Sequence, residues 1–403
     1  MEQVVKPNRL GSLDAFRGFL MLSLVSSAYT STSEAFGIST VLDRLGTSAI
    51  WEMVATQLRH VSWEWGGFWD LLMPAFILVV GIGMVYSYDN RKAQGQSDQQ
   101  ILGHLAVRCI ILVVLGSIGL KLLASLLNWN ALSLGHVSFA NVLCQIGFAS
   151  PCAFFLLKQT RRVQITASAG ILVLYWMAFA LWPIPETAHN SLIPTGKVED
   201  GPFSGFFRHW NPDVNFAADA DRWFLGVFGL NMNEYLRIVL PTLNFIPTVV
   251  TMVIGGEIAR LLRSSTDWRA KEKMLLGLGV SLLLGGIVLG LTICPVVKYI
   301  WTPSWVLYAG GFSILMFLPF VWIVESKSRA NWVFPFVVVG RNALLIYCLA
   351  FILLYRVSQV WGRLLGRGVF EGILGPVWQA MLFMVILWCI AYELNRRNIF
   401  VRL

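Results

Sequence analysis

Charged residues are scarce in this sequence. Of its 403 residues only 13% are Asp, Glu, Lys or Arg, whereas 56% are hydrophobic and 17 are tryptophan. The mean hydropathy is +0.66, and a typical soluble domain has about 25% charged residues. These values exclude an ordinary soluble enzyme and indicate a protein that crosses the membrane several times.

The sequence also lacks cysteines that could form disulfides outside the membrane. All six fall within expected apolar spans: Cys109, Cys144, Cys152, Cys294, Cys348 and Cys389. Their spacing does not fit a cysteine-based zinc site, so no metal is expected. The chain also lacks a polar stretch of about 100 residues, the usual size of a separate soluble domain. We therefore expect residues 1–403 to form one membrane-embedded domain.

About ten apolar segments approach the roughly 20 residues that a helix needs to cross the hydrocarbon. Their centres lie near Leu22, Ile77, Val113, Phe148, Leu174, Val250, Leu284, Leu315, Leu345 and Phe383. The pattern predicts an all-α fold, a polytopic bundle of about ten transmembrane helices. The polar start of the chain does not resemble a cleavable signal, so we expect the first span to be retained.

Clusters of Lys and Arg predict which loops face the cytoplasm. They occur before the first span and then in alternate loops, at Arg91 and Lys92, Arg161 and Arg162, Arg260 to Lys273, Lys327 and Arg329, and Arg396 and Arg397. Both termini are therefore expected to be cytoplasmic. The net charge of +9 suits anionic lipid headgroups, and no basic cluster interleaved with aromatics points to a nucleic-acid partner.

Three long loops are expected on the opposite side, over residues 30–67, 183–236 and 356–375. Long loops in compact domains are often functional. The second combines aromatic rings with amide and carboxylate groups, which would suit a sugar, although an interfacial loop is the alternative. Its Asp219 and Asp221 form one short acidic pair, which is more typical of solvated acids than of a metal site.

His60 is the strongest catalytic candidate, because an imidazole at the membrane boundary can act as a general base near neutral pH. If its segment is helical, Glu64 lies on the same face and could orient the ring. Asp70 enters the next span, about 15 Å further along a continuous helix. It could contact His60 only if the backbone turns, and a helix cap or an ion pair is the alternative.

Several polar residues are expected inside the membrane, where an unpaired charge is costly. Asp14, Arg17, Arg108, Arg341 and Asn342 lie toward the cytoplasmic side. The three arginines could bind the phosphates of an anionic donor that enters from the cytoplasm. Internal ion pairs, such as Asp14 with an arginine, are the alternative.

Four sequence blocks resemble the heparan-alpha-glucosaminide N-acetyltransferase family and its bacterial relatives. They are RLGSLDAFRGF at residues 9–19, HxSWxxxxxxDLxxPxF at 60–76, PVVKYIWTPSWVL at 295–307 and GRNALLIY at 340–347. The resemblance implies a multispan enzyme, usually a homodimer, that transfers an acetyl group from cytoplasmic acetyl-CoA to a sugar across the membrane. For this chain it implies the bacterial inner membrane.

The family motifs also match individual residues. The family's catalytic histidine matches His60, and its Asp-Leu-x-x-Pro motif begins at Asp70. Its Trp-Thr-Pro-Ser motif matches Trp301 to Ser304, and its Gly-x-Asn-Ala-Leu motif contains Asn342. The resemblance thus adds Trp301, Ser304 and Asn342 to the arginines as candidate donor-binding residues.

The sequence departs from the family at four positions. A family asparagine near the end of the first span aligns with Ala28, and the asparagine of Trp-Asn-Gly aligns with Glu64. The glutamine and arginine of the family's Val-Leu-Gln-Arg-Ile align with Cys144 and Gln145. These departures leave the identity of the acceptor open. The sequence also does not decide between direct transfer, with His60 as general base, and a route through an acetyl-His60 intermediate. Two other readings remain: a transporter or flippase for a sugar or lipid-linked intermediate, suggested by spans interrupted by Gly and Pro, and an inactive scaffold.

Overall fold

The computed structural model describes residues 10–27, 38–45, 48–120, 122–123, 125, 139, 141–184, 201–212, 214–227, 241–364 and 372–401. Its α-helices are α1 (Gly11–Ser27), α2 (Ile38–Leu45), α3 (Ala49–Gln57), α4 (Leu72–Ala93), α5 (Asp98–Val114), α7 (Val142–Leu157), α8 (Arg161–Ala180), α9 (Phe216–Val227), α10 (Phe245–Arg263), α11 (Trp268–Thr292), α12 (Pro303–Val321), α13 (Phe334–Gly340), α14 (Ala343–Leu364) and α15 (Gly375–Arg396).

Short 3₁₀ or π segments adjoin several of these helices. They are η2 (Phe68–Leu71), η3 (Leu115–Gly119), η5 (Gly205–Trp210), η7 (Thr242–Asn244), η8 (Trp322–Ser326) and η9 (Ala330–Val333). In the described part of the chain, β pairing is limited to isolated bridges. The predicted all-α fold is confirmed.

All ten predicted span centres lie within α-helices: α1, α4, α5, α7, α8, α10, α11, α12, α14 and α15. Among the described residues, seven helices are long and apolar enough to cross a membrane, or eight if the bent pair α13 and α14 counts as one span. The helix α7 is shorter and apolar. The number of about ten spans and the cytoplasmic position of both termini remain predictions.

Local sequence signals explain where several helices begin. The side chain of Ser97 accepts a hydrogen bond from the Gln100 backbone at the start of α5, and Asn141 caps α7 in the same way. At α12, Thr302 accepts from the Trp305 backbone and Pro303 occupies the first turn. Such caps satisfy backbone N–H groups that have no partner within the helix.

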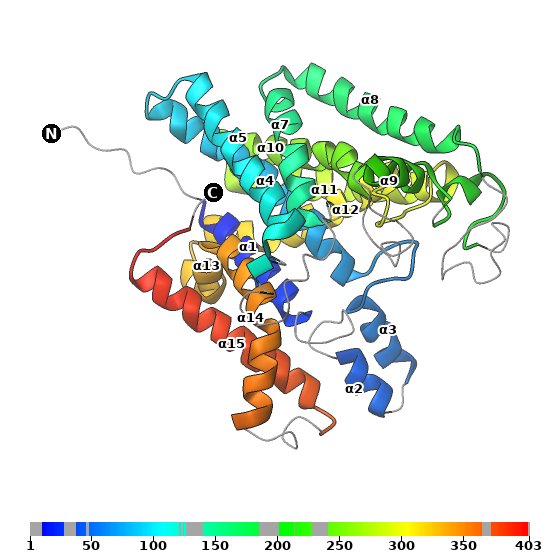
Figure 1. Cartoon of the computed structure of the whole chain (residues 1–403). Helices are drawn as coiled ribbons and strands as arrows, with labels where there is room; N and C mark the ends of the chain where they lie inside the picture. The colour runs from blue at the N-terminus through cyan, green and yellow to red at the C-terminus, as the bar shows by residue number, and fades with distance from the viewer. Residues whose placement is uncertain are drawn as a thin grey trace.

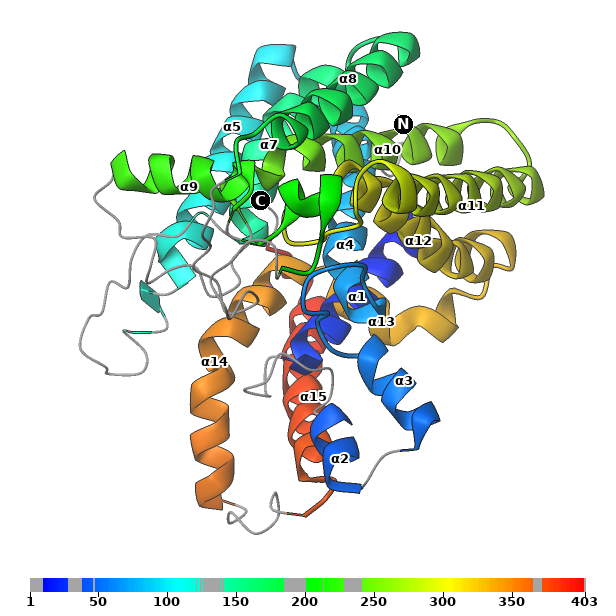
Figure 2. The ribbon, with the colours of Figure 1, turned by 90° about the vertical axis from the view of Figure 1, so that its right-hand side faces the viewer.

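Helix α4 lies near the middle of the bundle (Figures 1 and 2) and packs against α1, α7, α10 and α12. Its closest contact is with α10. A Cβ atom at Gly81 would overlap the Met252 carbonyl oxygen, and one at Gly255 would overlap that of Leu78. Small residues let helix backbones approach closely inside a membrane, so these glycines fix the distance between α4 and α10.

A second close contact joins α1 and α13. A Cβ atom at Gly18 would overlap the carbonyl oxygen of Phe336, and one at Gly340 would overlap that of Asp14. The two helices therefore touch along their backbones, with glycine on each side. The contact also sets the relative position of two arginines, because Arg17 precedes one of these glycines and Arg341 follows the other.

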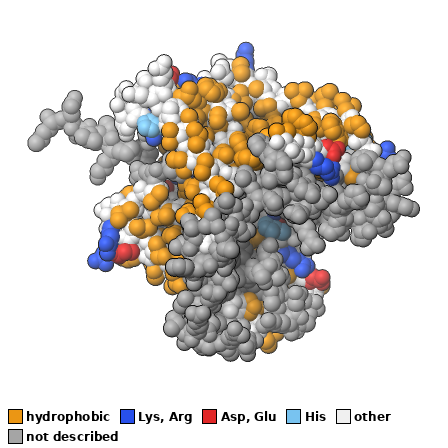
Figure 3. Space-filling view, viewed as in Figure 1, with side chains coloured by type: hydrophobic (Ala, Val, Ile, Leu, Met, Phe, Trp, Pro, Cys, Tyr) orange, Lys and Arg blue, Asp and Glu red, His pale blue; other side chains and the backbone are white. Residues whose placement is uncertain are grey.

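Apolar side chains cover much of the face seen in Figure 3. Exposed Val107, Ile110 and Val114 lie on α5, and Val173 and Leu174 lie on α8. Hydrophobic side chains on the outside of a helix are expected where the solvent is lipid. The outer faces of α5 and α8 therefore support a membrane-embedded bundle.

The expected long loops contain more regular structure than the sequence indicated. The first includes α2 and α3, the second includes η5 and α9, and the third begins later because α14 continues to Leu364. One cysteine prediction was wrong: Cys294 is buried just beyond the end of α11, in the segment before α12. Ala28 lies outside the described residues.

Candidate active site

The segment that carries His60 is not helical, and this brings His60 to Asp70. Residues 60–67 form turns and isolated bridges between α3 and η2. Trp65 has φ +62°, and its backbone N–H donates to the Val296 carbonyl at 2.7 Å. A positive φ is uncommon outside glycine, so this pairing with a distant segment maintains the turn that allows His60 and Asp70 to meet.

Asp70 is the centre of the site. Its carboxylate is buried, and Oδ1 lies 2.7 Å from His60 Nδ1. Oδ2 accepts backbone N–H groups from Val61 at 3.3 Å and Gly67 at 3.2 Å. A carboxylate with these partners holds both the ring and the turn around it.

Lys298 is the third member of the cluster, and sequence reasoning missed it. Its Nζ lies 2.5 Å from Asp70 Oδ1 and 2.8 Å from His60 Nδ1. The Lys298 side chain is only 7% exposed, whereas that of His60 is 40% exposed. Burial lowers the pKa of the Lys298 ammonium, and the Asp70 charge acts in the opposite direction.

The segment between α11 and α12 carries Lys298 and is held by its own polar contacts. Ser304 Oγ donates to the Pro295 carbonyl at 2.8 Å, and Thr302 Oγ accepts the Val297 N–H at 3.0 Å. The fully buried Trp301 has φ +49°. In the structure, Trp301 and Ser304 therefore shape the segment that presents Lys298.

Tyr299 connects this segment to the turn of His60. Its hydroxyl donates to the Val61 carbonyl at 2.9 Å, and its ring stacks on Trp63 with centroids 5.5 Å apart. Burial raises the pKa of Tyr299 to about 12, so the hydroxyl keeps its proton at neutral pH. These contacts fix the two segments relative to each other.

Glu64 does not take the position that a helix would have given it. Its side chain is exposed, and its backbone bridges to Val297. The described contacts of the His60 ring nitrogens involve Asp70 and Lys298 through Nδ1. In the described structure, Asp70 therefore occupies the place next to the imidazole that was expected of Glu64.

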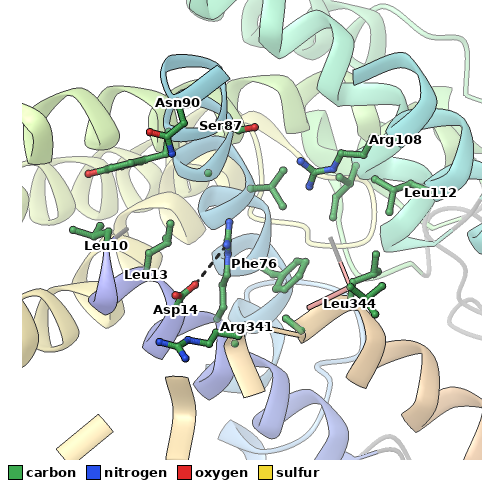
Figure 4. A pocket seen from close by; sticks show the side chains of 18 of the residues that line it. Leu10, Leu13, Asp14, Phe76, Ser87, Asn90, Arg108, Leu112, Arg341 and Leu344 are labelled. Carbon is green, nitrogen blue, oxygen red and sulfur yellow. Dashed lines mark ion pairs between the residues drawn. The ribbon is translucent and has the colours of Figure 1, made fainter. Parts of the chain in front are cut away.

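A cavity of about 630 Å³ lies further along α4, lined by its residues from Phe76 to Arg91. It is lined by four arginines and one acidic residue: Arg17, Arg91, Arg108, Arg341 and Asp14. Figure 4 shows Arg108 entering from α5 and Arg341 from beyond the end of α13. The excess of cationic groups makes the cavity suitable for an anionic ligand with several phosphates.

Two of these arginines have unused hydrogen-bonding capacity. Within the described part of the structure, the buried Nε atoms of Arg108 and Arg341 have no hydrogen-bond partner. Arg341 also donates to Asn395 Oδ1 at 2.8 Å. Arg17 Nη1 lies 4.0 Å from Asp14 Oδ1, so the expected internal ion pair forms. Arg17 also lines the cavity.

The structure brings together three of the six predicted donor-binding residues. Arg17, Arg108 and Arg341 line the cavity, and Arg91, which sequence reasoning used only for orientation, joins them. Asn342 instead bonds to the backbone of Ile399 and Val401 near the C-terminus. The sequence signal for Arg91 was its place in a basic cluster at the end of a span.

The acidic pair in the second long loop has structural contacts. Asp221 is buried and accepts the Thr242 N–H with both oxygens, whereas Asp219 pairs with Arg222 and accepts from Trp182. Burial raises the pKa of Asp221 to about 6. The expectation of two solvated acids was therefore wrong for Asp221, which holds the start of η7.

Comparison with known proteins gives two curated relatives. The heparan-alpha-glucosaminide N-acetyltransferases of Homo sapiens and Mus musculus are 23% and 22% identical to the chain, over 376 and 375 residues. The alignments cover 85% and 84% of this chain but 52% and 53% of the relatives. The chain thus spans about half the length of the curated relatives it matches. No family model matches it.

Proposed function

We propose that this distant relative of the heparan-alpha-glucosaminide N-acetyltransferases is a membrane-embedded acetyltransferase that uses acetyl-CoA as donor. The acceptor is an amine or hydroxyl group of a sugar on the opposite side of the membrane. The observation that carries the proposal is the contact between His60 and the buried Asp70 at one end of α4, with the arginine-lined cavity along the same helix.

The chemistry follows from the two ring nitrogens of His60. Nδ1 faces Asp70, so a ring with its proton on Nδ1 presents the lone pair of Nε2 to the acceptor. Nε2 accepts a proton from the acceptor as its nitrogen or oxygen attacks the thioester carbonyl. The C–S bond then breaks, and the proton passes to the CoA sulfur.

A two-step route uses the same atoms. Nε2 attacks the thioester carbon, the C–S bond breaks to release the CoA thiolate, and an acetyl-imidazolium forms. The acceptor then attacks the acetyl carbon, its proton goes to water, and the C–N bond to Nε2 breaks. Asp70 supports both routes because it orients the ring and stabilises the positive charge that develops on it. Exposure of the His60 side chain leaves room for either substrate.

The arginines supply donor binding. Arg108 and Arg341 each have a buried Nε without a partner in the described structure. Because Arg341 also donates to Asn395, Arg108 is the better candidate for a phosphate contact. Arg17, Arg91 and Arg341 add charge around the same cavity. The cavity-lining residue Phe76 lies six residues from Asp70, or about 9 Å along the helix, so an acyl chain extending from the cavity would approach His60.

The test uses the purified full chain in lipid nanodiscs with radiolabelled acetyl-CoA and acceptors that end in glucosamine. Wild-type protein should label the acceptor, and His60→Gln should lower the rate by at least about 100-fold. His104→Gln, which changes an exposed histidine on α5, is the matched control and should retain the rate. Undiminished transfer by His60→Gln would refute the assignment of His60.

Donor binding is measured separately with CoA by calorimetry. Arg108→Met should weaken binding by roughly 10-fold or more, as expected for loss of a charged hydrogen bond. His60→Gln should bind CoA as wild type does. If Arg108→Met bound CoA normally, the cavity would not be the phosphate-binding site.

A further inference from the structure

Three ionisable groups meet at one point in the candidate active site. Asp70 Oδ1 contacts both His60 Nδ1 and Lys298 Nζ, and the two nitrogens are 2.8 Å apart. We propose that Lys298 is a positioning residue that shares Asp70 with His60 and keeps the imidazole uncharged between turnovers. This inference rests on the proposed function, in which an uncharged ring must accept a proton.

Hydrogen-bond counting shows why the three groups compete. An ammonium group can only donate, and each imidazole nitrogen either donates or accepts. If Nδ1 donates to Asp70, then Lys298 donates to Asp70 alone and Nε2 has a free lone pair. If Lys298 donates to Nδ1, the proton lies on Nε2 and the ring cannot accept another there. Asp70 must therefore accept from both Nδ1 and the Lys298 ammonium for the ring to act as a base.

The charges at the site nearly cancel in their effect on the ring. Asp70 lies 2.7 Å from Nδ1 and attracts an imidazolium, whereas Lys298 lies 2.8 Å from the same atom and repels it. Coulomb energy depends inversely on distance, so the two effects are similar in size.

Other ionisable side chains around the cluster change this balance little. The hydroxyls of Tyr299 and Tyr308 are uncharged at neutral pH and donate to backbone carbonyls. On the segment of His60 itself, Glu64 is exposed and Arg59 is partly exposed, so solvent screens both. Lys298 and Asp70 are the two buried charges in contact with the ring.

Lys298 is a buried charge within an otherwise uncharged stretch of the sequence. It is the only charged residue in the block PVVKYIWTPSWVL, and its side chain is almost fully buried. A lysine is rarely buried unless it is paired, and here its partner is the same carboxylate that orients His60. A purely structural ion pair would not require contact with the imidazole nitrogen.

The test follows the titration of His60 directly by NMR, in wild-type protein labelled with ¹⁵N-histidine. The chain has five histidines, and His60→Gln identifies the signal of His60. Lys298→Met removes the positive charge and should move the titration midpoint of His60 upward by about one pH unit or more, since an opposite charge in contact then acts alone. Lys298→Arg keeps the positive charge and should therefore shift the midpoint less than Lys298→Met does.

A double variant excludes a general effect of misfolding. Asp70→Asn combined with Lys298→Met removes both charges and should return the midpoint toward the wild-type value. If Lys298→Met folds and the midpoint stays unchanged, the inference is wrong. This readout needs no turnover, so a failure of the inference is separate from a failure of the proposed function, which the labelled-acetyl assay decides.

Discussion

Replacing Asp70 by asparagine tests whether the buried cluster forms as described. The carboxylate holds four donors: His60 Nδ1, the Lys298 ammonium and the backbone N–H groups of Val61 and Gly67. An asparagine has one acceptor oxygen and one donor nitrogen. Its NH₂ group must therefore face either the two side chains or the two backbone donors, and one pair loses its acceptor.

The larger cost comes from the charge left behind. Lys298 is 7% exposed, and removing one partner of a buried ion pair costs about 3–5 kcal/mol. We therefore expect Asp70→Asn to lower the free energy of unfolding by about that amount, measured by denaturant titration in mixed micelles. Glu52→Gln, which changes an exposed carboxylate on α3, should stay within about 0.5 kcal/mol.

A double-mutant cycle decides whether the cost is due to the pair. Lys298→Met in the Asp70→Asn background removes the unpaired charge, so the double variant should be more stable than the sum of the single changes predicts by about 1–3 kcal/mol. Strict additivity of the two costs would refute the buried pair between Asp70 and Lys298, even if each variant were unstable by itself.

Three further changes test other parts of the structure. Gly18→Ala should destabilise the protein by about 1–3 kcal/mol, because its Cβ would overlap the Phe336 carbonyl oxygen. Gly170→Ala, which has open space around it, is the control. Equal thermal stability of the two variants would contradict the close contact. Gly83→Ala should displace the Arg17 guanidinium that lies over it and raise the KM for acetyl-CoA without changing thermal stability. Gly103→Ala, the control, should leave the KM unchanged. A normal KM for Gly83→Ala would count against Arg17 as a donor contact. Burial raises the pKa of Asp221 to about 6 from an ordinary value of 3.8, so the folded state binds this proton more tightly than the unfolded state. The free energy of unfolding should therefore fall by up to about 3 kcal/mol as pH rises from 4 to 6. Denaturant titration of Asp221→Asn should show less of this decline, and an unchanged pH dependence would refute the assignment.

The sequence predicted the helices well because their signal is local. A run of about 20 apolar residues or a capping side chain needs no knowledge of distant parts of the chain, and all ten predicted centres lie in helices. The ends of the connecting segments were less predictable. For example, α14 extends to Leu364 through a region expected to be a loop.

The site was predictable only in part, because it depends on contacts between distant segments. His60 and Asp70 were recognised, but their contact needs the turn at Trp65, which pairs with Val296. No spacing rule within residues 60–70 indicates that partner. Lys298 was visible in a quoted block, yet only the fold shows that it lies 2.8 Å from His60 Nδ1.

In the proposed function, the length of helix α4 sets the distance that the donor must span. Asp70 lies in η2, just before α4 begins at Leu72. The Arg17 guanidinium lies beside Gly83, thirteen residues from Asp70 or about 20 Å further along. A small acyl donor such as acetyl phosphate, if held by that arginine, would place its reactive carbon far from His60. Under the proposed function, only a molecule whose anionic group and acyl group are separated by a long flexible arm could engage both places at once. The length of one helix would then select among donors without contacting the acyl group itself.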